Sequence, residues 1–216
     1  MCGRYYVTSP PAAIIERFGL EDADAQLELG VNIAPTQRVG IITNEQPRRL
    51  TAARWGLVPF WADDIRIGAR LFNARAETAH EKPAFRQAFR RRRCLVPADG
   101  FYEWRELPTG RKQPVRFALR SGDMLAFAGL WDVWKPPEGP PLISCTILTT
   151  DANALVMPVH NRMPVVLPRE AEQEWLAEAT EEELRALLAP IPAELMVAEE
   201  VDPALLRGPR ARTESA

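Results

Sequence analysis

The chain has 216 residues, 46% hydrophobic and 26% charged, which is the composition of an ordinary globular protein with a substantial core. Its formal net charge of −2 at pH 7 excludes a polycation that would bind nucleic acid indiscriminately. No apolar run approaches the roughly 20 residues of a membrane span, and the first residues lack the apolar stretch of a signal peptide, so we expect a cytoplasmic protein.

Alternating apolar residues, β-branched residues and turn signals predict a few helices and many short strands. In chain order the predicted elements are the helix Pro11–Phe18, the strands Val39–Thr43 and Leu50–Val58, the helix Pro83–Arg92, the strands Cys94–Pro97, Phe101–Glu106, Pro114–Arg120, Met124–Trp134, Ser144–Thr150 and Pro164–Leu167, and the helices Arg169–Ala177 and Glu181–Leu188. Thr180 is the expected N-cap of the last helix.

Many strands with few helices predict an α+β fold. We expect a single domain over residues 1–207, built on a curved, β-barrel-like and mainly antiparallel sheet that a few helices flank. The polar segment 208–216 is expected to be a disordered tail.

The three cysteines, Cys2, Cys94 and Cys145, are odd in number and widely spaced, which argues against a disulfide framework. No Cys-x-x-Cys pair or Cys/His cluster indicates a zinc site. We therefore expect neither a metal nor a cofactor.

Cys2 follows Met1, which is commonly removed when the next residue is small. Removal would leave an α-amine and a thiol on one residue. The amine, with an ordinary pKa of about 7.7–8.0, is partly neutral at physiological pH and attacks an aldehyde to give a Schiff base. The thiol can then close on the same carbon to form a five-membered thiazolidine. Position alone is equally compatible with a cysteine that stands beside the start codon by chance.

Two further side chains are candidates for proton transfer. Glu103 lies in a predicted strand among apolar and aromatic neighbours, where desolvation would raise the pKa of its carboxyl group toward that of a useful acid or base. An outward-facing glutamate is the alternative. His160 lies in a stiff, proline-bounded loop together with Arg162, a candidate anion contact. His80 lies in a polar stretch and is expected at the surface.

Several polar and aromatic segments are typical of nucleic-acid contacts. Asn73 and Arg75 follow an irregular stretch, where an amide beside a guanidinium can orient a ligand. Arg54–Trp61 combines arginine with tryptophan, as a platform that stacks single-strand bases does, although tryptophan is commoner in cores. The run Arg90–Arg93 is compatible with a phosphate patch or with the solvated end of a helix.

Together these segments resemble the SRAP family, named as SOS response-associated peptidases. The matching blocks follow the family's order and are Met1–Tyr5, Asn32–Pro35, Trp55–Trp61, Asn73–Thr78, Cys94–Trp104, Leu148–Asn153 and His160–Pro164. One block alone is weakly specific, whereas the ordered set is specific.

The resemblance implies a compact domain with a β-barrel-like core, which recognises abasic sites in single-stranded DNA and shields them through a stable thiazolidine crosslink. It implies that Cys2 supplies both nucleophiles and that Asn73 holds the α-amine and the sugar by hydrogen bonds. It further implies that Glu103 assists sugar-ring opening and proton transfer, and that His160 shuttles a proton. The peptidase in the family name we interpret chiefly as the release of Met1.

The resemblance also implies contacts with DNA. Arg4, Arg75 and Arg162 resemble the phosphate-binding arginines, while Pro35 and Trp61 resemble the surfaces that stack on neighbouring bases. An abasic nucleotide has no base to read, so phosphate contacts plus stacking are the expected binding physics. The implied partner is single-stranded DNA with abasic sites, including single-strand/double-strand junctions. The protein is expected to be a monomer that joins the nucleoid when it is bound to damaged DNA.

Two positions depart from the family pattern. Asn161 stands where an acid often follows the histidine, which would weaken the orientation of His160. The segment Glu199–Pro203 lacks an expected Asn-containing pattern, so the contacts of the C-terminal segment are an open question.

Two other functions remain open. Amidohydrolases with an N-terminal nucleophile, such as class II glutamine amidotransferases, also begin with Met-Cys-Gly. In such an enzyme Cys2 would form a thioester with its own amine as base. A non-catalytic single-strand-binding domain, in which Cys2 is incidental, would bind DNA reversibly and never covalently.

Overall fold

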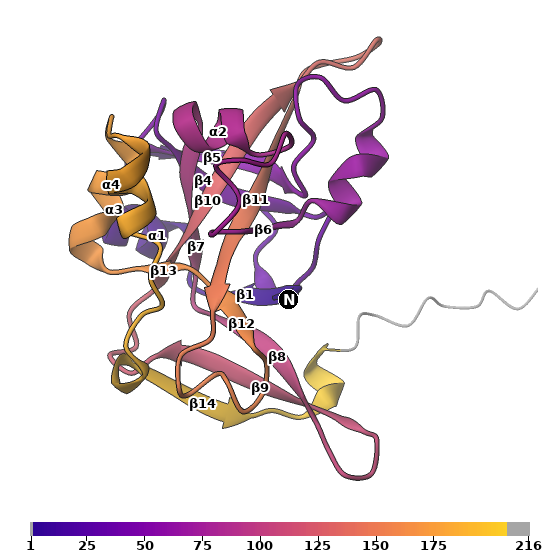
Figure 1. Ribbon diagram of the computed structural model, residues 1–216, viewed down its shortest axis with the longest axis vertical. Coiled ribbons are helices and arrows are strands. Elements are labelled where there is room, and N and C mark those ends of the chain that lie inside the picture. The colour runs from indigo at the N-terminus through magenta and orange to yellow at the C-terminus, as the bar shows by residue number, and fades with distance from the viewer. Residues whose placement is uncertain (1, 207–216) are drawn as a thin grey trace, which may run out of the picture.

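A closed barrel forms the centre of the computed structural model, which describes residues 2–206 (Figure 1). Its strands are β4 (Arg38–Thr43), β5 (Arg49–Trp55), β7 (Arg93–Ala98), β10 (Leu125–Trp134) and β11 (Leu142–Asp151). They follow the order β11-β10-β7-β4-β5, and a parallel pairing of Cys145 in β11 with Trp55 in β5 closes the ring. The other pairings in the ring are antiparallel. The predicted α+β fold with a barrel-like, mainly antiparallel sheet is confirmed.

A second, antiparallel sheet extends below the barrel in Figure 1. In spatial order it contains β14 (Met196–Glu200), β9 (Lys112–Leu119), β8 (Gly100–Glu106), β1 (Arg4–Val7) and β3 (Gly30–Ile33). Since β7 ends directly before Asp99 and β8 begins directly after it, the chain passes from the barrel to this sheet at Asp99. The Asp99 carboxylate accepts hydrogen bonds from the backbone N–H groups of Thr8 at 2.5 Å and Ser9 at 2.8 Å, which ties the crossing to the end of β1.

Aromatic side chains fill the core where the two sheets meet. The ring of Tyr5 in β1 lies edge-on to those of Trp55 and Phe127, with centroids 5.1 and 5.9 Å apart. Phe101 of β8 contacts Phe127 in the same way at 6.2 Å. All four side chains are buried. This packing holds β1, and Cys2 directly before it, in a defined position relative to both sheets.

Short strands extend the barrel sheet. Asn73 begins β6 (Asn73–Arg75) and pairs with Ile147 of β11, while β12 (Arg162–Pro164) pairs with the last residues of β11. β13 (Val166–Leu167) pairs with β10, and β2 (Asp22–Ala23) pairs with β5. The single predicted strand Pro164–Leu167 is therefore wrong, because the chain passes from β11 to β10 at Val165. The N–H of Val165 donates to the carbonyl oxygen of Leu148 in β11 at 2.9 Å, and its carbonyl oxygen accepts from the N–H of Ala128 in β10 at 2.9 Å.

The α-helices gather mainly on one side of the barrel. Figure 1 shows α1 (Pro11–Phe18), α3 (Arg169–Leu176) and α4 (Glu181–Ala186) together on the left. Thr180 caps α4 as predicted, since its hydroxyl accepts from the backbone N–H of Glu183 at 3.3 Å and the Glu183 carboxylate accepts from the Thr180 N–H at 2.8 Å. α2 (Arg86–Arg91) is shorter than the predicted Pro83–Arg92. The 3-10 helices are η1 (Ile65–Arg70), η2 (Ala193–Leu195) and η3 (Pro203–Leu206).

The C-terminal segment crosses the second sheet. β14 pairs with β9, where Glu199 lies opposite Arg116 and forms an ion pair with it. Beyond β14, the carbonyl oxygen of Leu206 in η3 accepts a 2.9 Å hydrogen bond from Nδ2 of Asn32 in β3. This answers the open question about Glu199–Pro203, while the predicted tail 208–216 lies outside the described residues. No helix within residues 2–206 is long and apolar enough to cross a membrane.

Two polar residues are more buried than their sequence context predicts. Arg93 is 2% exposed, and its guanidinium donates to the carbonyl oxygens of Phe89 in α2 and Trp175 in α3. Arg93, the last residue of the run Arg90–Arg93, is therefore neither part of a phosphate patch nor at a solvated helix end. It connects the ends of α2 and α3. His80 is also buried, and the prediction of a surface position is wrong, because its ring packs against Phe89 with centroids 6.1 Å apart.

β5 ends at Trp55 rather than at the predicted Val58, because Gly56 turns the chain. Gly56 has a φ of 131°, which side-chain-bearing residues rarely adopt. A Cβ at Gly56 would lie 2.4 Å from the carbonyl oxygen of Gly68 in η1. The close contact of these two backbones holds the loop after β5, which carries Trp61.

We expect Gly56→Ala to lower the free energy of unfolding by about 2–5 kcal/mol, the sum of a strained φ and an overlap that backbone atoms cannot relieve. Urea denaturation measures the change. Gly110→Ala is the matched control, because Gly110 also has a positive φ, 74°, but a Cβ added there would meet no atom within 4 Å. A loss at Gly56 no larger than at Gly110 would contradict the importance of the contact with Gly68.

Candidate active site

Cys2 lies directly before β1 and beside β8. Antiparallel pairing sets Arg4 opposite Tyr102, so the residues before Arg4 run past Glu103. The Cys2 side chain is fully buried, and its Sγ lies 3.5 Å from the carbonyl oxygen of Arg4. Burial raises the pKa of the Cys2 thiol far above its ordinary range, and the negative charge of Glu103 raises it further. The thiol is therefore protonated at neutral pH.

Asn73 connects Cys2 to the barrel sheet. Its Nδ2 donates a 2.7 Å hydrogen bond to the backbone carbonyl oxygen of Cys2. Its Oδ1 is buried and accepts no hydrogen bond within residues 2–206. One end of the Asn73 amide thus fixes the backbone of Cys2, and the other end offers an acceptor to a ligand.

Glu103 is a buried carboxylate, as the aromatic context of its strand predicts. It lies opposite Val115 of β9 and is 4% exposed. Burial raises the pKa of Glu103, and the neighbouring His160 offsets part of the rise. The charge of Glu103 raises the pKa of the Cys2 thiol, and His160 lowers the pKa of Glu103. These three residues therefore interact electrostatically with one another in sequence.

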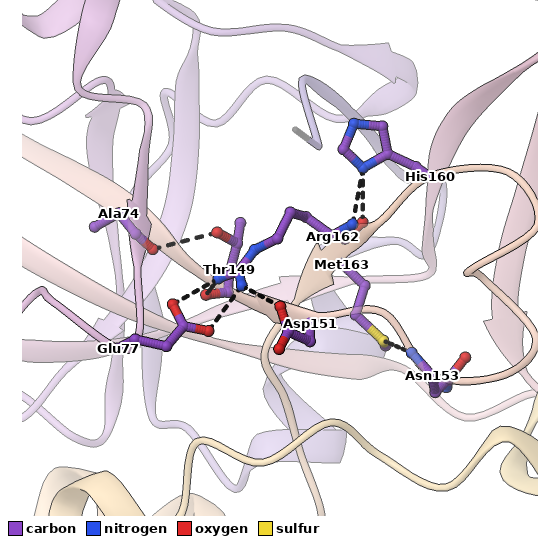
Figure 2. A network of polar contacts seen from close by, with 8 residues as sticks. All are labelled: Ala74, Glu77, Thr149, Asp151, Asn153, His160, Arg162 and Met163. Carbon is purple, nitrogen blue, oxygen red and sulfur yellow. Dashed lines mark hydrogen bonds and ion pairs between the residues drawn. The ribbon is translucent and has the colours of Figure 1, made fainter.

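A backbone group orients the half-buried ring of His160 (Figure 2). Its Nδ1 accepts a 2.9 Å hydrogen bond from the backbone N–H of Arg162 and lies 3.1 Å from the carbonyl oxygen of the same residue. Asn161 in place of an acid was expected to weaken this orientation. The ring nevertheless has an orienting partner, one residue farther along the chain.

The three arginines predicted to bind phosphate lie in different environments. Arg75 is exposed on β6 and, two residues after Asn73, faces the same side of the strand. Arg4 is half-buried and donates to the carbonyl oxygen of Gly3 at 2.7 Å. The side chain of Arg162 is 12% exposed and forms ion pairs with acidic neighbours. Arg75 is therefore the most accessible of the three.

The loop after β5 presents two aromatic side chains to solvent, with Phe60 49% and Trp61 48% exposed. Side chains of β10 hold this loop from below. Oδ2 of Asp132 accepts from the backbone N–H of Phe60 at 3.0 Å, and Nε1 of Trp134 donates to the carbonyl oxygen of Ala62 at 2.6 Å. The exposed rings therefore stand on a backbone that is anchored on both sides.

Pro35 precedes a strained residue. Thr36 has a φ of 79°, which is uncommon for a β-branched side chain, and its N–H donates to the carbonyl oxygen of Trp55 at 2.7 Å. This contact fixes the turn that carries Pro35. Trp55 itself is fully buried, so the predicted stacking role within Arg54–Trp61 narrows to Trp61.

A family model described as SOS response associated peptidase (SRAP) matches residues 1–207. The chain belongs to this family. Abasic site processing protein YoqW of Bacillus subtilis is 43% identical over 97% of this chain and 96% of its own length. Abasic site processing protein YoaM of the same bacterium is 41% identical over 97% of this chain and 94% of its own. A solved structure of a protein from Bacteroides thetaiotaomicron has a TM-score of 0.85 at 27% identity and covers 95% of this chain and 99% of its own.

The structure adds residues to this SRAP site that the sequence did not single out. Glu77 and Asp151 form ion pairs with Arg162, and Phe60 is exposed beside Trp61. Glu77, Asp151 and Phe60 all lie within blocks that carry the family resemblance, which was the only available signal. Their contacts join distant parts of the chain, so no local pattern could assign them a role.

The side chains that come together in this SRAP chain are nucleophilic and acid–base groups. Cys2, Asn73 and Glu103 are linked by the hydrogen bond and the electrostatic contact described above, and His160 influences Glu103. Within residues 2–206, no group of three or more His, Cys, Asp or Glu side chains is arranged to hold a metal ion.

Proposed function

We propose that this protein captures abasic sites in single-stranded DNA through a thiazolidine between Cys2 and the aldehyde of the ring-opened sugar. The observation that carries the proposal is the setting of Cys2, which is held through its carbonyl by Asn73 beside the carboxylate of Glu103. The relatives YoqW and YoaM are named abasic site processing proteins, which supports an abasic site as the substrate.

Removal of Met1 supplies the second reactive group. The α-amine of Cys2 attacks the sugar aldehyde, and the carbinolamine loses one water to give a Schiff base. The Cys2 sulfur then bonds to the imine carbon, the C=N bond becomes single, and the thiol proton ends on nitrogen. One aminothiol and one aldehyde thus give one thiazolidine and one water. Release of Met1 by the site itself would account for the peptidase in the family name.

The protonation states of the buried groups support this order of steps. The amine needs no thiolate for its attack, and a protonated Cys2 thiol carries the proton that the imine nitrogen takes up. Glu103, with its raised pKa, is suited to give a proton to the departing hydroxyl group and to recover it. His160 would shuttle a proton at the sugar oxygen, and Asn73 Oδ1 would accept from the α-amine or a sugar hydroxyl.

The surface around the site is suited to a strand without a readable base. We assign phosphate contacts to the exposed Arg75 and to Arg4, and stacking contacts to Trp61 and Pro35. The proposed partner is single-stranded DNA, including its junctions with duplex, bound by a monomer.

The test is incubation with a single-stranded oligonucleotide that carries one abasic site. We expect a conjugate that survives heat and SDS. Its intact mass should equal that of the protein without Met1, plus the DNA, minus one water. An oligonucleotide with tetrahydrofuran in place of the abasic sugar has no aldehyde and should form no conjugate. Recovery of unmodified protein from the abasic reaction would refute the covalent mechanism.

Arg75→Ala is expected to weaken reversible binding of the tetrahydrofuran oligonucleotide several-fold. Because one phosphate contact is lost, the slope of log affinity against log salt should fall by about 0.7, the value for single strands. Fluorescence anisotropy across a salt series measures both quantities. Arg111→Ala, in the exposed turn between β8 and β9, is the matched control and should change neither. An unaltered salt slope in Arg75→Ala would rule out its phosphate contact.

The amidohydrolase alternative makes a different prediction for the same residue. Cys2 would then form a thioester with a glutamine analogue and no adduct with an abasic aldehyde. Glu103, beside Cys2, and His160, beside Glu103, would have no function in that reaction. The structure therefore favours aldehyde chemistry, and parallel intact-mass measurements with the two reagents distinguish the alternatives.

A further inference from the structure

The guanidinium of Arg162 is enclosed by acidic side chains from two neighbouring elements (Figure 2). Its Nη1 donates to Oε1 of Glu77 and to Oδ1 of Asp151, both at 2.7 Å. Its Nη2 donates to Oε2 of Glu77 at 2.8 Å and to the carbonyl oxygen of Thr149 at 2.6 Å. A guanidinium has five N–H donors, and these contacts use the four on Nη1 and Nη2.

The three charged residues lie on, or just after, three adjacent strands. Glu77 follows β6, Asp151 ends β11, and Arg162 begins β12 directly opposite Asp151. β11 pairs with both other strands at this point. The ion pairs therefore fix the first residue of β12 against the barrel sheet, with the two-pronged geometry that arginine adopts toward a carboxylate.

The backbone of the same residue determines where His160 carries its proton. The Arg162 N–H donates to Nδ1 of His160 at 2.9 Å, and the Arg162 carbonyl oxygen lies 3.1 Å from the same nitrogen. The backbone N–H always carries its hydrogen, so a proton on Nδ1 would bring two hydrogens together, and the shorter contact makes Nδ1 the acceptor. A neutral imidazole has one donor and one acceptor nitrogen, and the proton must then lie on Nε2. Nε2 is thus the nitrogen through which the neutral ring donates its proton.

We propose that Glu77 and Asp151 act through Arg162 as positioning residues, which hold His160 in the Nε2–H tautomer that the crosslinking reaction uses. This inference rests on the proposed function, because it gives His160 a part in that reaction. It assigns Arg162 a role other than the phosphate contact that the family resemblance implies.

The charges around Arg162 argue against a phosphate contact. The two carboxylates balance the charge of Arg162, and its four Nη hydrogens are already donated to protein oxygens, so this guanidinium has no Nη donor to offer a phosphate. The neighbouring Arg75, whose positive charge also acts on Glu77, is the exposed one. Partial burial raises the pKa of Glu77, but the hydrogen bond to Arg162 outweighs burial and lowers this pKa overall. The same ion pairs outweigh burial and raise the pKa of Arg162. Glu77 and Arg162 are therefore both charged at neutral pH.

Two variants separate positioning from phosphate binding. Glu77→Gln keeps the shape of the side chain but removes its charge, and Arg162→Lys keeps the charge but loses the two-pronged contact. We expect both to lower the crosslinking rate constant at saturating abasic DNA about tenfold or more. We expect the affinity for the tetrahydrofuran oligonucleotide to change less than about twofold, because the cluster makes no phosphate contact.

A phosphate contact would give the opposite pattern. Glu77→Gln would free the guanidinium and tighten DNA binding, Arg162→Lys would weaken it, and the rate at saturation would be unchanged. That result would overturn the proposal. Thermal melting confirms that each variant is folded, and Glu77→Gln, which alters only an exposed partner of the pair, serves alone if Arg162→Lys is unfolded.

The tautomer itself can be measured on the free protein by long-range ¹H–¹⁵N NMR of the two histidines, with signals assigned through His160→Asn. We expect neutral His160 to be Nε2–H in the wild type and a mixture of tautomers in Glu77→Gln. Arg75→Ala, the matched control, should change DNA affinity but not the tautomer. A wild-type ring protonated on Nδ1 would overturn the proposal. This readout needs no crosslink, so it separates failure of the positioning role from failure of the proposed function.

Discussion

Cys2→Ala is expected to eliminate the heat-stable conjugate with abasic DNA while reversible binding persists. Alanine is small enough for a methionine aminopeptidase to remove Met1 without Cys2, so the processed variant, identified by its intact mass, keeps an α-amine at the same position. That amine can still form a Schiff base, which water reverses. Without a thiol no ring closes, and the adduct is lost on heating. Denaturing electrophoresis after incubation with abasic DNA measures the loss.

Borohydride makes the same variant more informative. Reduction of the Schiff base gives a stable secondary amine, so a conjugate of Cys2→Ala should reappear only when the reductant is present. Cys94→Ala and Cys145→Ala are matched controls, because both thiols are equally buried but lie in barrel strands. They should crosslink without reductant. A Cys2→Ala variant that forms the heat-stable product as well as wild type would exclude the thiazolidine.

The longer strands of the fold were predictable because each contains enough alternation to be recognised. Strands such as β8 and β10 were predicted to within one residue at their ends. The short strands β1, β3 and β6 have three or four residues, too few for a period to emerge. The pairing of Trp55 with Cys145 closes the barrel, and it cannot be read from the local sequence pattern of either strand. The sequence could therefore predict a barrel-like fold class but not the strand order.

Some features of the candidate site were likewise predictable from the sequence, and others were not. Burial of Glu103 was predicted from the aromatic residues around it in the strand and is confirmed, while a free amine on Cys2 stays a prediction. That Asn73 holds Cys2 was implied by the family resemblance in the form of an amine contact, whereas the structure has Nδ2 on the Cys2 carbonyl. The enclosure of Arg162 could not be foreseen, because its partners lie on other strands.

Glu103 illustrates why the active site costs stability. Burial disfavours the charged form of the Glu103 carboxylate, so the folded protein binds a proton at Glu103 at a pH where the unfolded chain has released it. Between the ordinary pKa of 4.5 and the raised value, the folded state holds more protons than the unfolded state. Stability contributed by this group is therefore present below pH 4.5 and is lost as the pH rises through the folded pKa.

Glu103→Gln should accordingly raise the melting temperature at neutral pH and lose that advantage near pH 4, where the wild-type carboxyl is protonated in both states. The amide cannot transfer a proton, so the crosslinking rate should fall by about 10²–10⁴-fold. Scanning calorimetry at the two pH values and quenched crosslinking reactions measure these effects. Glu106→Gln, at the exposed end of the same strand, should change neither the melting temperature nor the rate.

A Glu103→Gln variant that is destabilised at pH 7 would show that the carboxylate is stabilised by its surroundings, contrary to its raised pKa. A gain in stability together with a loss of rate would identify Glu103 as a residue kept for chemistry at the expense of the fold.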